Sequence, residues 1–120
     1  MNTALWIAAA LLAVVALTGG VTKAFVPQVK LAAHPGGAWT GERSAGFVKT
    51  LGVLELLAAA GLILPAALGV APILVPVTAA CWVLLMIGAM TTHLRHGEAK
   101  FAALNLAYLA VAVFVAWGRA

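Results

Sequence analysis

Glu55 is the residue of this sequence that says most about chemistry, because it is an acid inside a long apolar segment. Residues 47–64 span about 18 residues, the length of a membrane-crossing helix, and Glu55 lies near their middle. A carboxylate at that depth costs several kcal/mol unless it is paired or protonated. Two interpretations are open: Glu55 forms a hydrogen bond between helices, or it serves a ligand, a proton or an ion.

The polar residues of the other apolar segments gather at the same end as Glu55. Each belongs to the half of its segment that faces the connecting loops 23–46 and 93–100, whereas Trp82 is one of the few interruptions of the opposite half. This distribution predicts a polar, partly hydrated pocket that opens toward those loops, with Glu55 at its floor. Alternatively, the lysines reach the membrane interface and the threonines bond to their own helices. The candidate pocket residues are Thr18, Thr22, Lys23, Lys49, Glu55, Thr91, His93, Asn105 and Tyr108.

His93 and His96 are the residues that come closest to a metal-binding pattern, since they are three apart and Glu98 follows. Arg95 and Lys100 stand beside them, and their positive charges oppose a cation. We therefore expect a polar surface segment and no metal. The four apolar segments contain no histidine at haem-binding depth, and the sequence has no phosphate-binding glycine motif, nucleophile elbow or dinucleotide fingerprint. We therefore assign no catalytic residue and expect no catalysis by this chain alone.

The composition excludes a soluble globule. Of the 120 residues, 65% are hydrophobic and 8% are charged, against about 25% charged in an ordinary soluble domain. The seven basic and three acidic residues are too few and too scattered to bind nucleic acid. Cys81 is the single cysteine, which excludes an internal disulfide.

Four apolar segments are long enough to cross a bilayer. Polar loop 23–46 contains prolines, glycines and charges that hydrocarbon does not accept. We predict an all-α bundle of four transmembrane helices that forms one domain over residues 1–120, with membrane lipid around it. The expected spans are about 3–22, 47–64, 71–92 and 101–117.

Packing between the spans should follow from short connections and small residues. The short link between the second and third spans predicts that these two form a tight antiparallel hairpin. Small residues three or four apart let helix backbones approach closely in lipid, and they could also join copies of the chain. Such residues are Ala9, Ala13, Ala16 and Gly20 in the first span, Gly52, Ala58 and Ala59 in the second, and Ala103, Ala107 and Ala110 in the fourth.

The basic residues predict the orientation in the membrane. All of them except Arg119 flank the first and third loops. The positive-inside bias therefore places those loops in the cytoplasm and both termini outside.

The first span ends in GGVTKAF, the second carries LGVLELLAAAGLILP, and the third runs into MTTHLRHGE. Together these three motifs resemble the small DoxX-like membrane proteins of bacteria. The resemblance covers nearly the whole chain, and its motifs are mostly hydrophobic. The matching positions are Gly20, Lys23, Gly52, Glu55, Pro65, His93, Gly97 and Glu98.

The resemblance implies a bacterial plasma-membrane protein linked to redox complexes, since the family takes its name from a subunit of a thiosulfate:quinone oxidoreductase. It implies an accessory subunit whose pocket, around Glu55, Lys23, His93 and Tyr108, binds a quinone or another small amphiphile, with redox proteins as partners. Two alternatives are a structural or assembly protein without catalysis, and a proton-coupled exporter. Small multidrug exporters also have four spans and one embedded glutamate, but they carry it in the first span, whereas Glu55 is in the second.

Overall fold

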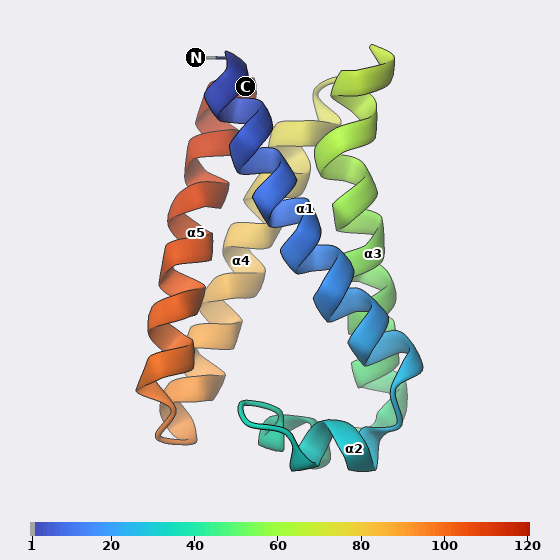
Figure 1. Ribbon diagram of the computed structural model, residues 1–120, viewed down its shortest axis with the longest axis vertical. Helices are drawn as coiled ribbons and strands as arrows, with labels where there is room; N and C mark the ends of the chain where they lie inside the picture. The colour runs from blue at the N-terminus through green and yellow to red at the C-terminus, as the bar shows by residue number, and fades with distance from the viewer. Residues whose placement is uncertain (1) are drawn as a thin grey trace.

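The computed structural model describes residues 2–120 and is built from helices (Figure 1). Four of them are long and apolar enough to cross a membrane. At about 1.5 Å per residue, their 21 to 24 residues exceed the hydrocarbon thickness of about 30 Å. The predicted all-α bundle of four transmembrane helices is therefore confirmed. The elements are α1 (Asn2–Phe25), α2 (Gln28–Ala33), the 3-10 helix η1 (Ala38–Glu42), α3 (Ala45–Leu68), α4 (Leu74–Arg95) and α5 (Ala99–Arg119).

The ends of α3 follow from local backbone chemistry. Ser44 caps its first turn, because the Ser44 side chain accepts a hydrogen bond from the Phe47 nitrogen at 3.1 Å. At the other end the helix continues past Pro65, where the sequence suggested a stop, and ends at Gly69, whose φ of 66° is left-handed. Pro65 lies in the last turns, so its missing N–H removes only one hydrogen bond close to the end.

The long helices pack as two pairs, α1 with α3 and α4 with α5. The expected tight hairpin of the second and third spans is thus wrong in part. Helices α3 and α4 meet beside their connecting turn, where a Cβ atom on Gly61 would lie 2.5 Å from the Thr78 hydroxyl oxygen. From there they separate toward the opposite end of the bundle (Figure 1).

Glycine explains why α1 prefers α3. A Cβ atom added to Gly52 would lie 2.6 Å from the Ala24 nitrogen and 2.9 Å from the Gly20 carbonyl oxygen. The two backbones therefore touch where any larger residue would force them apart. In the first two stripes, Ala9, Ala16, Gly20 and Gly52 are buried as expected. The α5 stripe is different, because Ala103, Ala107 and Ala110 lie exposed on the outer surface and join no helices of this bundle.

The tightly packed core occupies the end of the bundle that holds the start of α1, the end of α5 and the α3–α4 turn. Its side chains come mainly from the first halves of α1 and α4 and the second halves of α3 and α5, among them Leu12, Leu62, Val75 and Val115. Large apolar side chains such as Ile7, Leu57 and Leu84 are exposed on the outside, as a lipid-facing surface requires. The opposite end is held apart and is where the polar residues gather.

Residues 26–44, here called the cover segment, lie across that open end and contain α2 and η1 (Figure 1). The segment is braced internally, because the Gln28 amide nitrogen donates to the carbonyl oxygens of Thr40 and Arg43 at 2.6 and 2.5 Å. Part of the predicted polar loop is therefore ordered helical structure. The start of α1 and the end of α5 lie at the other end of the bundle (Figure 1). The cytoplasmic location of the loops stays a prediction.

Candidate functional site

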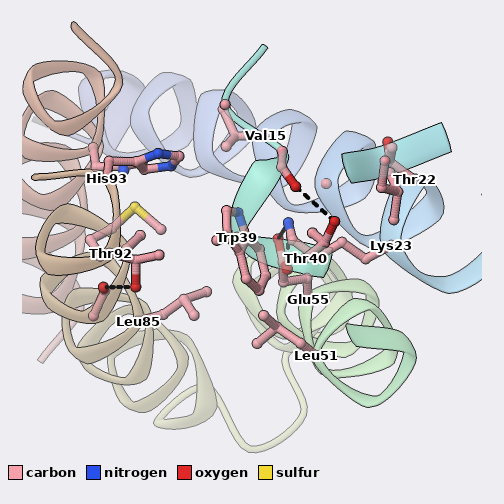
Figure 2. A pocket seen from close by; sticks show the side chains of 18 of the residues that line it. Val15, Thr22, Lys23, Trp39, Thr40, Leu51, Glu55, Leu85, Thr92 and His93 are labelled. Carbon is pink, nitrogen blue, oxygen red and sulfur yellow. Dashed lines mark hydrogen bonds and ion pairs between the residues drawn. The ribbon is translucent and has the colours of Figure 1, made fainter. Parts of the chain in front are cut away.

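A cavity of about 610 Å³ lies between the two helix pairs, beneath the cover segment (Figure 2). It exists because the pairs diverge toward the loop end, where no apolar core fills the space between them. Helices α1, α3, α4 and α5 and the cover segment all contribute side chains. The polar lining residues are Thr22, Lys23, His34, Trp39, Thr40, Arg43, Glu55, Trp82, Thr92, His93, Asn105 and Tyr108.

An ion pair between α1 and α3 forms one wall of this cavity. The Lys23 Nζ lies 2.9 Å from Oε2 of Glu55 and donates a hydrogen bond to Oε1 at 3.3 Å. Glu55 is 5% exposed. Gly19 provides the space for the carboxylate, since a Cβ atom there would lie 2.6 Å from Oε1. The intramembrane charge that the sequence left unexplained is therefore balanced by a residue of the neighbouring helix.

Two buried hydrogen-bond donors in the lining have no partner within residues 2–120. They are the amide nitrogen Nδ2 of Asn105 on α5 and the indole nitrogen Nε1 of Trp82 on α4. Leaving a buried donor unpaired costs about 1–3 kcal/mol. Both side chains belong to the cavity lining but their donor atoms are covered, so an acceptor oxygen of a molecule inside the cavity would satisfy them after a shift of the side chain. The site is thus suited to a group that carries hydrogen-bond acceptors.

His93 occupies the mouth of the cavity. Its Nδ1 lies 2.8 Å from Oε1 of Glu98, so this ring nitrogen donates to the carboxylate. The imidazole also stacks on the Phe101 ring, with centroids 5.5 Å apart. Gly36 of the cover segment packs against Phe101 as well, since an added Cβ atom would lie 3.1 Å from the Phe101 ring. His93 is therefore held in one orientation at the rim.

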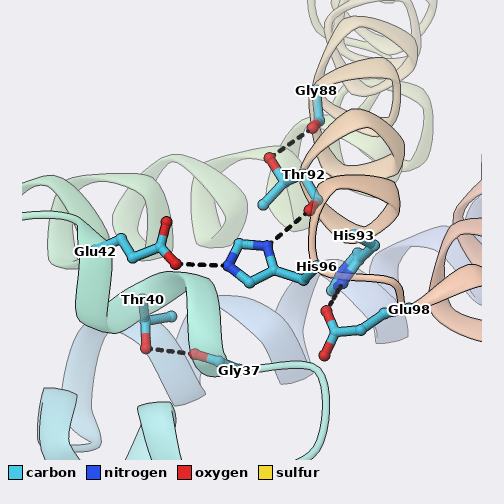
Figure 3. Close-up of polar contacts among 8 residues, drawn as sticks. All are labelled: Gly37, Thr40, Glu42, Gly88, Thr92, His93, His96 and Glu98. Carbon is cyan, nitrogen blue, oxygen red and sulfur yellow. Dashed lines mark hydrogen bonds and ion pairs between the residues drawn. The ribbon is translucent and has the colours of Figure 1, made fainter.

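His96 connects the cover segment to the end of α4 (Figure 3). Its Nε2 lies 2.7 Å from Oε2 of Glu42, and its Nδ1 lies 2.9 Å from the Thr92 carbonyl oxygen. Both neighbours are acceptors, so both ring nitrogens donate when the imidazole is protonated. The Thr92 carbonyl, and after it the Glu42 carboxylate, raise the pKa of His96. His93 and His96 thus face two different carboxylates and do not converge on one point.

Of the nine candidate pocket residues predicted from the sequence, six line the cavity and three do not. Glu55, Lys23, His93, Asn105, Tyr108 and Thr22 line the one cavity. Lys49, Thr18 and Thr91 are exposed and do not line it. Thr91 donates to the Ile87 carbonyl oxygen of its own helix at 3.0 Å, as the alternative interpretation describes, whereas Lys49 donates to the Ala24 carbonyl oxygen of the neighbouring α1 at 3.5 Å.

Sequence reasoning missed the contribution of the cover segment and of Trp82. The sequence predicts a connecting loop for Trp39, Thr40 and Arg43, yet all three line the cavity. Figure 2 shows Trp39 and Thr40 there. The sequence places Trp82 in the apolar half of its span, yet this residue is 2% exposed and belongs to the cavity lining. An indole N–H inside an apolar span is itself a signal, because a buried tryptophan normally finds a partner for that donor.

These features define a small multi-pass membrane protein with a polar cavity at the end of the bundle that carries the loops. The chain matches the DoxX-like family over residues 7–115 and belongs to that family. The comparison with curated proteins found no match, and neither did the comparison with solved structures. The family resemblance seen in the motifs is thereby confirmed, and the chain is a multi-pass membrane protein, whereas its location in a bacterial plasma membrane stays a prediction.

Proposed function

We propose that this protein binds a quinone, or a small amphiphile with a similar head group, as an accessory subunit of a membrane redox system. The observation that carries the proposal is the pair of unpartnered donors on two lining residues, Nδ2 of Asn105 and Nε1 of Trp82. The carbonyl oxygens of a quinone are acceptors for such donors. The volume of about 610 Å³ lies within the range of about 300–1,000 Å³ typical of ligand pockets.

The aromatic residues of the lining support the same proposal. Trp39 from the cover segment, Trp82 and Tyr108 surround the polar interior with flat apolar surfaces. A quinone ring stacks on such surfaces and presents its oxygens at its edge. In this proposal the quinone is the redox-active group, this chain binds and orients it, and a partner protein exchanges electrons with it.

Quinone binding by the purified protein in lipid nanodiscs tests the proposal. Binding of a decyl-tailed benzoquinone should quench tryptophan fluorescence, because Trp39 and Trp82 line the cavity. Asn105→Leu should weaken binding about tenfold, which corresponds to the loss of one hydrogen bond. Thr91→Val is the control, since Thr91 is exposed outside the cavity and its loss should not alter binding. Unchanged affinity in Asn105→Leu would count against the proposed site.

One observation favours the second candidate, a structural or assembly role. The exposed stripe of Ala103, Ala107 and Ala110 offers a close-packing surface on the outside of α5. The exporter alternative gains no comparable support, because Glu55 is paired with Lys23. Glu55→Gln separates the three roles: reduced quinone-dependent activity supports the accessory subunit, reduced cation resistance supports export, and an unchanged phenotype supports assembly.

A further inference from the structure

We infer that the ligand of the cavity carries an apolar tail, and that it enters from the loop-side half of the bilayer through a lateral opening between α3 and α4. This inference rests on the proposed function and adds two properties of the ligand, its route of entry and its apolar tail. Its first support is that the cavity lining reaches the lipid-facing surface. Leu84 is 70% exposed and Phe47 is 48% exposed, and both line the cavity.

The arrangement of the two helices creates the opening. Helices α3 and α4 touch near their connecting turn, at Gly61 and Thr78, and then diverge. In the diverging half, Leu51 on α3 and Leu85 on α4 point toward one another across the cavity (Figure 2). Gly88, one helical turn beyond Leu84, has no side chain to close the space, and a Cβ atom added there would meet nothing within 4 Å.

The polarity of the walls sets the orientation of the ligand. The opening is bordered by Leu51, Leu84 and Leu85, whereas the Lys23–Glu55 pair lies inside, on the α1 and α3 side. A molecule that satisfies both regions has a polar head and an apolar tail. The head lies among the polar groups, and the tail passes Leu84 into the lipid, where its burial favours binding.

The route from water is covered. At the loop end, Gly36 packs on Phe101, and Glu42 bridges to His96 at 2.7 Å. These two contacts join the cover segment to the α4–α5 pair across the mouth of the cavity. The side facing the lipid has no equivalent bridge among the ion pairs and hydrogen bonds of residues 2–120. Entry through the bilayer therefore meets less protein than entry from water.

Two benzoquinones with the same head, one with a decyl tail and one without, test this inference in nanodiscs. Gly88→Phe places a ring in the opening without displacing any protein atom near the new Cβ. Gly46→Phe is the matched control, because Gly46 is also a helical glycine facing open space and does not line the cavity. Leu84→Trp, at the 70%-exposed position, is a second obstruction.

We expect Gly88→Phe and Leu84→Trp to slow association of the tailed quinone and to weaken its binding at least about tenfold, because its tail occupies the opening. The tailless quinone leaves the opening empty and should keep its affinity, and Gly46→Phe should alter neither ligand. Equal weakening of both quinones, or unchanged binding of the tailed one, would overturn the lateral opening while the proposed function stands. If the unaltered protein binds neither quinone, the proposed function fails, and this inference fails with it.

Discussion

The Lys23–Glu55 ion pair allows a quantitative prediction about what holds α1 against α3. At the Nζ–Oε2 distance of 2.9 Å, and with an effective dielectric constant of about 20, the Coulomb attraction is about 6 kcal/mol. Desolvation offsets most of it, because moving each ion out of water costs several kcal/mol. The two side chains differ in this respect, since that of Lys23 is 22% exposed and that of Glu55 is 6% exposed.

This difference in exposure predicts that the two single variants lose unequal amounts of stability. Lys23→Met leaves the buried carboxylate unpaired and should lower the free energy of unfolding by about 3 kcal/mol, the lower end of the range for such pairs. Glu55→Gln leaves only the partly exposed lysine, whose long side chain can reach the interface, and should lower it by about 1 kcal/mol. The double variant should lose about 2 kcal/mol, which is about 2 kcal/mol less than the sum of the single losses.

Reversible unfolding in mixed detergent micelles, followed by circular dichroism, measures the four free energies. Lys100→Met is the control, because Lys100 is an exposed lysine of α5 outside the cavity, and its loss should be below about 0.5 kcal/mol. If the double variant loses the sum of the single losses within about 0.5 kcal/mol, the two residues are uncoupled and the argument from the ion pair is refuted.

Two further predictions concern helix packing and pH. Gly52→Ala should destabilise the protein by about 1–3 kcal/mol, because its Cβ meets backbone atoms of α1. Gly46→Ala, facing open space on the same helix, should be neutral or slightly stabilising, and equal losses in denaturant unfolding would contradict the close approach. For His96, the Thr92 carbonyl and the Glu42 carboxylate raise the pKa, with the nearby Glu98 adding to the effect, so the folded state binds the proton more tightly. The unaltered protein should therefore have a higher unfolding midpoint than His96→Gln. This difference should be full below about pH 6.5 and should vanish as the pH rises through the pKa that His96 has in the folded state. A difference independent of pH would contradict the bridge between His96 and Glu42.

Much of the architecture is predictable from the sequence because the bilayer imposes strict requirements. A spanning helix needs about 20 apolar residues, and charges and prolines are confined to the connections, so the four helices follow from hydropathy alone. The gathering of polar residues at one end follows from their positions along those helices. Glu55 and Asn105 could therefore be assigned to one end of the bundle before any helix was placed beside another.

The lateral arrangement was decided only by the tertiary structure. The helices are apolar nearly all round, so the sequence does not mark which face of each helix meets a neighbour. Contact between the backbones at Gly20 and Gly52 pairs α1 with α3, against the expectation from the short α3–α4 connection. That pairing brings Lys23 to Glu55, separates α3 from α4, and leaves the donors of Trp82 and Asn105 at one cavity. Hydropathy determines how deep a residue lies, and close packing between helices determines which residues it meets.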